Sequence, residues 1–249
     1  MRKADSSRGT YRSAAVSCYD ALTGDHQRAL LAYLGRIRPI EQTVLDVGCG
    51  TGKLLESLVR AGWIGSGVDR SVAMVRAARH RCPGIRIVVG DARKFSVPAP
   101  VGLVTATFDV VNHIGSDGGL AAFIRCARKA LLPGGTLVFD SVTPHDIDRN
   151  WGSYVDYTSQ KHWRLARFGR RIGPCVGEIR YELFCRARDG GWELHEERHR
   201  LRAWPRLTLE RALLDAGFVR TKFVDAGTLS RPGRSCGRWL ITAVRSRDI

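Results

Sequence analysis

Short apolar runs alternate with helix-like segments over the first 140 residues of the chain. Strands are predicted for the apolar runs at 43–47, 64–68, 85–89, 103–108 and 136–139. Apolar residues at helical spacing predict helices at 51–61, 72–80 and 120–132, the last ended by Pro133-Gly134-Gly135, and a further helix near 25–35. Repeating strand–helix units of this length are typical of a parallel, doubly wound α/β sheet.

Beyond residue 140 the pattern changes. Residues 141–175 show little periodicity, and their aromatic residues are either a substrate platform or the core beneath an insertion; the group is Trp151, Tyr154, Tyr157 and Trp163. Strict alternation at 176–187 and 192–204 predicts an antiparallel hairpin. A helix at 207–216 and strands at 218–224 and 239–244 complete a mostly parallel seven-stranded sheet, with the hairpin region inserted before the last helix.

The chain is predicted to form one domain over residues 1–249, because no repeat or flexible linker divides it. Residues 1–17 are polar, rich in Ser and Arg, and expected to be flexible. Residues 141–205 form the inserted region. We expect it to cover the carboxyl ends of the parallel strands, where ligands bind in open α/β sheets.

The most distinctive motif is a glycine-rich turn between the first strand and its helix. Residues 44–52 are Val-Leu-Asp-Val-Gly-Cys-Gly-Thr-Gly, and Asp69 follows the next strand. A dinucleotide fingerprint has the spacing G-x-G-x-x-G, but here the third glycine comes one residue early, at Gly52. Residues without a Cβ let the backbone approach a ligand closely. The turn therefore predicts a site for an adenosine-containing cofactor.

Four motifs follow one another in a fixed order. They are VLDVGCGTGKL at 44–54, GVDRS at 67–71, VVGDARKF at 88–95, and the pair FDVVNHI at 108–114 and LLPGGTLVFD at 131–140. In this order, over residues 40–245, the chain resembles the class I S-adenosylmethionine-dependent methyltransferases. The resemblance implies a Rossmann-like fold with S-adenosyl-L-methionine as the cofactor.

The resemblance also implies which residues hold the cofactor. Asp69 would accept hydrogen bonds from both ribose hydroxyls, Asp91 would bind the adenine amino group, and Ala92 would pack on the adenine ring. The whole implied set is Asp46, Gly48, Cys49, Gly50, Thr51, Gly52, Asp69, Arg70, Gly90, Asp91, Ala92, Thr107, Phe108 and Asn112.

Three shorter features narrow the resemblance to the small-molecule subgroup, which includes glycine, sarcosine and amino-sugar N-methyltransferases. They are the pair Tyr19-Asp20, the pair Asn112-His113, and the run at 199–202, His-Arg-Leu-Arg. The residues at 24–27 depart from the subgroup pattern. The resemblance implies transfer of a methyl group to a nitrogen or oxygen nucleophile of a small molecule in specialised metabolism.

Candidates for the chemistry follow from what methyl transfer requires. The nucleophile must be aligned with the methyl carbon and must be unprotonated, so a base near neutral pKa is suitable. His113 after the fourth strand, His145 after the fifth and His199 in the hairpin are the candidates, each of them alternatively a structural histidine. Tyr19 is either a lid over the cofactor or a hydrophobic anchor. Cys49 is not expected to be a nucleophile.

Composition places few further limits. The 249 residues are 44% apolar and 26% charged, which is ordinary for a globular domain. No apolar run is long enough to span a bilayer, and no signal-peptide core is visible near Met1, so we expect a cytoplasmic protein without membrane contact. The seven cysteines are dispersed and never spaced C-x-x-C, so we expect neither a disulfide framework nor a metal site.

The net charge of +16 leaves two interpretations open. It indicates either a polyanionic partner such as RNA or a composition rich in arginine, since 34 of the 40 basic residues are Arg and none lie in a basic block. The alternative function is therefore an RNA methyltransferase, although FDVVNHI stands where base methylases carry N-P-P-Y. A third reading is a cofactor-binding scaffold without transfer. The chain is expected to be a monomer or a homodimer.

Overall fold

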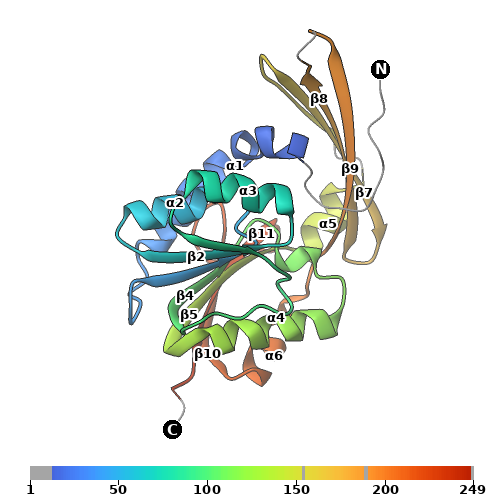
Figure 1. Cartoon of the computed structure of the whole chain (residues 1–249). Coiled ribbons are helices and arrows are strands. Elements are labelled where there is room, and N and C mark those ends of the chain that lie inside the picture. Colours follow the sequence, from blue (N-terminus) through green and yellow to red (C-terminus); the bar gives the residue numbers. More distant parts are fainter. Residues whose placement is uncertain (1–12, 153–154, 188–189, 248–249) are drawn as a thin grey trace.

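A seven-stranded sheet forms the centre of the computed structural model, which describes residues 13–152, 155–187 and 190–247 (Figure 1). Its strands are β1 Thr43–Val47, β2 Ile64–Asp69, β3 Arg86–Val89, β4 Val101–Ala106, β5 Leu131–Val142, β10 Phe218–Asp225 and β11 Arg238–Arg245. The order is β10-β11-β5-β4-β1-β2-β3, and β11 runs antiparallel to both of its neighbours. The predicted mostly parallel, doubly wound sheet is confirmed.

Helices cover both faces of this sheet (Figure 1). On one face lie α1 Ser13–Leu34, α2 Lys53–Arg60 and α3 Val72–Arg81; on the other lie α4 Asp117–Ala130 and α6 Arg206–Asp215. Each helix buries a spaced apolar face, as in α2, where Leu54, Leu55 and Leu58 are buried. The two layers make two hydrophobic cores that share the strands between them.

A second, four-stranded antiparallel sheet projects from the carboxyl end of the parallel strands (Figure 1). Its strands are β6 Val155–Ser159, β7 Trp163–Gly173, β8 Val176–Arg186 and β9 Trp192–Arg202, and α5 Pro144–Asn150 precedes it. The predicted hairpin is its β8–β9 half. The sequence does not predict β7, because the apolar residues of this strand change from one face to the other partway along it. Arg167 pairs with Asp156, while Phe168 lies beneath the guanidinium of Arg180.

The aromatic residues at 151–163 do not form a common platform. Trp163 is buried with Leu183 in the small core of the second sheet, and Tyr157 is 59% exposed. Trp151 packs where a side chain at Gly177 would lie, and its Nε1 donates to Asp146 Oδ2 at 2.9 Å. Tyr154 lies outside the described residues. The core interpretation therefore holds for Trp151 and Trp163.

The element boundaries differ from the prediction most clearly at two places. The first helix begins at Ser13, so residues 13–17 are helical, while residues 1–12 of the segment predicted to be flexible lie outside the described part. Helix α4 ends at Ala130 and β5 begins at Leu131, so Pro133-Gly134-Gly135 lies within a strand rather than ending a helix. The pairing of β4 with β5 shifts register there, which the positive φ of Gly134 (80°) accommodates. No helix in the described ranges has the length and apolarity to cross a membrane.

Candidate functional site

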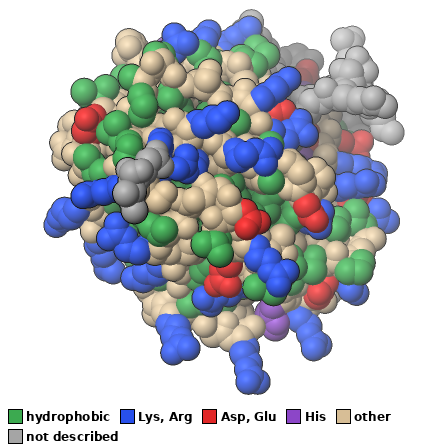
Figure 2. Space-filling view, turned by 90° about the horizontal axis from the view of Figure 1, so that it is seen from below, with side chains coloured by type: hydrophobic (Ala, Val, Ile, Leu, Met, Phe, Trp, Pro, Cys, Tyr) green, Lys and Arg blue, Asp and Glu red, His purple; other side chains and the backbone are tan. Residues whose placement is uncertain are grey.

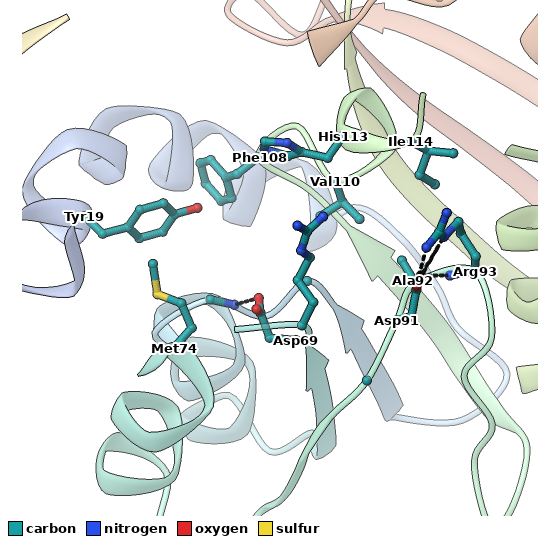
Figure 3. A pocket seen from close by; sticks show the side chains of 14 residues that line it. Tyr19, Asp69, Met74, Asp91, Ala92, Arg93, Phe108, Val110, His113 and Ile114 are labelled. Carbon is teal, nitrogen blue, oxygen red and sulfur yellow. Dashed lines mark hydrogen bonds and ion pairs between the residues drawn. The ribbon is translucent and has the colours of Figure 1, made fainter. Parts of the chain in front are cut away.

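A cavity of about 370 Å³ opens at the carboxyl ends of β1, β2 and β4. Figure 3 shows Tyr19, Phe108 and His113 on one side of it and Met74 and Asp69 on the other. The residues that line it are Tyr19, Gly48, Gly50, Asp69, Arg70, Met74, Gly90, Asp91, Ala92, Arg93, Phe108, Val110, His113 and Ile114. Its position matches the rule for ligand sites in open α/β sheets.

The glycine turn is fixed by its own backbone. The N–H groups of Gly48 and Cys49 donate to the carbonyl of Val68 at 2.7 and 3.1 Å. Gly48 has φ +70°, and a Cβ there would lie 2.3 Å from Cγ2 of Val110. The turn therefore needs glycine at 48 for both conformation and space. This close packing brings the wall formed by Val110 directly against the floor formed by the turn.

Asp69 connects the turn to the start of α3. Its carboxylate accepts the N–H of Gly50 at 2.9 Å and the N–H of Ser71 at 2.8 Å. Burial raises the pKa of this carboxyl, and the two backbone N–H groups oppose that shift. A carboxylate has about four acceptor positions, so two remain for a ligand. The cavity thus offers a fixed hydrogen-bond acceptor of the kind a ribose diol requires.

Asp91 is held differently, on the rim of the cavity. The guanidinium of Arg93 contacts it through Nε at 3.0 Å and Nη2 at 2.6 Å, and the Arg93 N–H donates to Oδ1 at 2.8 Å. These contacts with Arg93 lower the pKa of Asp91 to about 2. The Asp91 carboxylate, which was expected to bind the adenine amino group, therefore already accepts hydrogen bonds from Arg93. Ala92 lines the cavity.

Tyr19 reaches the cavity because hydrogen bonds and an ion pair of the next residue, Asp20, hold α1 against the glycine turn. The hydroxyl of Thr51 donates to Asp20 Oδ1 at 2.5 Å, Arg81 pairs with the same carboxylate, and Lys53 Nζ donates to the Asp20 carbonyl at 3.0 Å. Tyr19 then stands opposite Gly50, with its hydroxyl directed into the cavity (Figure 3). Burial and nearby carboxylates raise the pKa of this phenol, so it stays protonated.

Two histidines from distant segments meet at the wall opposite Asp69. His113 belongs to the short helix η1 Val111–His113 and lies 5.5 Å from the ring of His199, centroid to centroid; Tyr181 lies 5.0 Å from His199 on its other side. His199 Nε2 is 3.0 Å from Glu197 Oε2. Burial, and then the neighbouring His199, lowers the pKa of His113 to about 4, so its imidazole is neutral at pH 7.

Six residues of the expected cofactor set do not line this cavity. Asp46, Cys49, Thr51 and Thr107 line a small void of about 20 Å³ behind the turn. Asp46 accepts the hydroxyl of Thr105 at 2.7 Å, and burial raises its pKa to about 7; burial also raises the pKa of the Cys49 thiol. These residues support the turn from behind. None of these four residues lines the cavity itself.

Gly52 and Asn112 are the other two of these six, and both have structural roles. A Cβ at Gly52 would lie 3.1 Å from the Cβ of Ala78, so this glycine lets α2 pack against α3. The Asn112 amide donates to Ser141 Oγ at 3.1 Å and to the Arg202 carbonyl at 2.8 Å, and accepts the Val142 N–H at 3.0 Å. Its amide is thus hydrogen-bonded within the protein, and binding of the cofactor by Asn112 stays a prediction.

Of the four catalytic candidates, the structure brings three together. Tyr19 and His113 line the cavity, His199 supports His113 from behind, and His145 is exposed on α5, away from the cavity. Sequence reasoning missed four lining residues, namely Met74, Arg93, Val110 and Ile114. Val110 and Ile114 stood in the quoted FDVVNHI motif, and Met74 in the first turn after Asp69, so proximity to a motif was the available signal.

The cavity fits an adenosine-containing cofactor. A buried carboxylate with spare acceptor positions faces it, glycine backbone lines its floor, and apolar groups of Met74, Ala92 and Ile114 supply surfaces for a flat ring. Among the described residues, no group of three His, Cys, Asp or Glu side chains is placed to hold a metal ion.

Comparisons with known proteins identify relatives of this chain. The family model described as "Methyltransferase domain" matches residues 44–135. A dTDP-3-amino-3,6-dideoxy-alpha-D-glucopyranose N,N-dimethyltransferase of Streptomyces fradiae is 28% identical over 221 residues, 86% of this chain and 82% of that protein. A trans-aconitate 2-methyltransferase of an Acidovorax strain is 30% identical over 59% of this chain and 56% of its own length.

Among solved structures, CalS10 of Micromonospora echinaspora, an amino pentose methyltransferase with S-adenosylmethionine bound, is 26% identical. The match covers 96% of this chain and 100% of that one, with a TM-score of 0.75. DesVI of Streptomyces venezuelae matches over the same shares of the two chains, with a TM-score of 0.78 at 23% identity. The similarity therefore extends over the inserted sheet as well as the central one.

Proposed function

We propose that this chain is a class I S-adenosylmethionine-dependent methyltransferase that methylates an amino group of a small molecule, and that its acceptor is an amino sugar. One observation carries the proposal: the Tyr19 hydroxyl and the neutral ring of His113 face the same cavity as Asp69 and the glycine turn. The S. fradiae relative and CalS10 support it, since both are named for methylation of amino sugars.

The residues divide between two tasks. Asp69 would hold the ribose hydroxyls, the backbone at Gly48 and Gly50 would lie against the methionine part, and Ala92 would face the adenine. Bound there, S-adenosylmethionine supplies an electrophilic methyl group on a sulfonium. Tyr19 and His113 then line the space from which a nucleophile must approach, and holding it in line is itself a large part of the rate enhancement.

An amine attacks only through a free lone pair. The neutral imidazole of His113 can accept a hydrogen bond from an amine N–H, which directs the lone pair away from the ring and toward the methyl group. The phenol of Tyr19 keeps its proton and supplies a hydrogen-bond donor at the opposite side. Behind His113, the inserted sheet contributes the rings of His199 and Tyr181.

A labelled transfer assay tests the proposal. The protein is incubated with S-adenosylmethionine and a panel of nucleotide-linked 3-amino and 4-amino sugars, each paired with its hydroxyl counterpart, and products are followed by mass spectrometry. We expect one or two added methyl groups on amino sugars only. His113→Gln should lower kcat by about a hundredfold, the usual scale for a positioned acid–base group. His145→Gln, on exposed α5, should leave it unchanged. Methylation of the hydroxyl sugars or of trans-aconitate instead would refute the amine assignment.

A second candidate, an RNA methyltransferase, is favoured only by the net charge of +16. On the face shown in Figure 2, Lys and Arg side chains are spread among apolar and uncharged ones and do not form one patch. Tight binding of transfer RNA that weakens steeply with salt would support this candidate. A cytoplasmic location and a monomeric or dimeric state remain predictions.

A further inference from the structure

The chain is strained at one wall of the cavity. Phe108 and Asp109, which follow β4, have φ values of +62° and +69°. Residues other than glycine are disfavoured in this left-handed region, and two in succession persist only when the surroundings hold them there. Such strain is concentrated at functional sites, and Phe108 lines the cavity.

A single buried carboxylate holds both strained residues. Asp140, in β5, accepts the N–H of Phe108 at 2.9 Å through Oδ2 and the N–H of Asp109 at 3.0 Å through Oδ1. The Asp140 side chain is only 9% exposed. Asp140 therefore binds both N–H groups of the strained turn, one carboxylate oxygen to each, and we call this arrangement of Asp140 with Phe108 and Asp109 the clasp.

Arg238, the first residue of β11, closes the clasp from the other side. Its Nη1 lies 2.6 Å from Asp109 Oδ1 and 3.1 Å from Asp140 Oδ2. One guanidinium nitrogen thus connects the side chain of the strained residue with the carboxylate that binds its backbone. Without this cation two carboxylates would face each other in a half-buried space, at a large electrostatic cost.

This arrangement positions the side chain of Phe108. Its side chain lines the main cavity and also a void of about 20 Å³ formed with Asp140, Arg238 and Leu240. The ring is therefore a partition with space on both sides. Phe108 also packs against the core that lies beneath α1, α2 and α3, and the strained backbone at 108–109 sets the direction from which its side chain reaches that core.

We propose that Asp140 and Arg238 are positioning residues for the methyl-transfer site, which hold the strained turn Phe108–Asp109 so that the Phe108 ring forms the wall of the cofactor cavity. The inference rests on the proposed function, because it assigns these residues to the same cavity. It adds Arg238 of β11, which lies in none of the motifs of the chain, and it gives a role to Asp140, the last residue of the motif at 131–140.

The chain contains a matched control for Arg238. Arg245 is the last residue of the same strand, is also half-buried, and donates from Nη1 to the carbonyls of Arg128 and Leu131 at 3.2 and 2.6 Å. It lies at the opposite end of β11, far from the cavity. Arg245→Met should therefore reproduce the loss of a half-buried arginine without touching the turn.

The first experiment measures binding of S-adenosylhomocysteine by calorimetry, together with the thermal midpoint of each variant. Arg238→Met should weaken binding by about tenfold, the scale of the strain that is no longer held. Arg238→Lys should bind within about threefold of the unchanged protein, since one nitrogen makes both contacts. Arg245→Met should bind normally at a comparable loss of thermal midpoint. Equal affinities in Arg238→Met and Arg245→Met would overturn the proposal.

The second experiment tests strain directly, in the Arg238→Met background. Asp109→Ala removes the opposed carboxylate but keeps a Cβ at the positive φ, whereas Asp109→Gly removes both the carboxylate and the strain at position 109, and Phe108 is unchanged in both. If holding the strained turn is the function of the pair, Gly should restore affinity by about fivefold more than Ala does. Equal recovery by Gly and Ala would overturn the proposal and assign Arg238 only to charge neutralisation.

The two proposals fail in different ways. If the unchanged protein binds the cofactor product but methylates no amine, the proposed function is wrong and the binding comparison still tests the clasp. If amines are methylated and the two arginine variants bind alike, the clasp is wrong and the function stands.

Discussion

The two sides of the cavity are built in different ways. The cofactor side is backbone and one carboxylate from a single stretch, residues 46–71, and its hydrogen bonds lie largely within that stretch. The opposite side is made of side chains from α1 and from residues 108–114, with His199 and Tyr181 of the inserted sheet behind His113, and these segments meet only in the folded chain. A site made of local backbone geometry is encoded in a short motif, whereas a wall of distant side chains has no such signature.

The largest effect should come from the cofactor side. Gly48→Ala places a Cβ 2.3 Å from Val110 Cγ2 at a positive φ, so Val110 must move into the cavity. We expect cofactor binding to weaken by at least about a hundredfold, or about 2.7 kcal/mol. The matched control is Gly62→Ala, where φ is +90° and no atom lies within 4 Å of the added carbon. Calorimetry should show unchanged affinity there, with a stability loss of about 1–2 kcal/mol. Similar affinities in the two variants would remove the distinction between the sides.

On the opposite side, the burial of His113 should be visible in the pH dependence of the free energy of unfolding. The pKa of His113 is about 4 in the folded chain against 6.5 for the free group. Between these pH values the unfolded state binds more protons, so stability from this group is present above pH 6.5 and is lost as pH falls toward 4. His113→Gln should therefore gain stability relative to the unchanged protein on acidification, by at most about 3 kcal/mol.

Urea unfolding at pH 7 and pH 4.5 measures this shift. His145→Gln is the control, since its side chain is exposed and should follow the unchanged protein at both pH values. A constant difference between His113→Gln and the unchanged protein would mean that the ring is not enclosed as the structure shows.

The two acids that line the cavity, Asp69 beside the glycine turn and Asp91 on the rim, should differ from each other. Asp69→Ala removes the acceptor of two buried N–H groups as well as the contact to the ribose, and should weaken cofactor binding by about 2 kcal/mol. Asp91→Ala removes a rim carboxylate that is already paired with Arg93, so a loss under about 1 kcal/mol is expected. Equal losses in calorimetry would contradict the placement of the ribose at Asp69.

The smallest effect is expected at the attachment of α1 to the glycine turn, which connects the two sides of the cavity. Asp20→Asn weakens the attachment of α1 to Thr51 and Arg81 in a part-exposed ion pair, which should cost about 1 kcal/mol of stability. Because this attachment places Tyr19, kcat should fall while cofactor affinity changes little. Glu56→Gln weakens another ion pair of Arg81 and serves as the control, with unchanged kcat. A fall in kcat in both variants would place the effect in α2 and α3 rather than in α1.

Much of the fold could be predicted from the sequence, because each strand of the central sheet is an apolar run flanked by turn residues. β1 is predicted to the residue, and Asp69 is placed at the end of β2 because acid and glycines form one motif. His145 and His199 show the limit: His145 follows β5 and His199 lies within β9, and only packing decides that one is exposed and the other buried. Arg238 had no signal at all, since its partners lie 98 and 129 residues away.

The central claim is that this cavity transfers a methyl group from S-adenosylmethionine to an amine of a small molecule. The most direct measurement is nuclear magnetic resonance of the product formed from ¹³C-methyl S-adenosylmethionine and a nucleotide-linked amino sugar. The account predicts a labelled methyl carbon with the chemical shift of an N-methyl group, formed at a rate that falls in His113→Gln. A labelled methyl carbon with the chemical shift of an O-methyl group, or no label in the amino sugar, would contradict it.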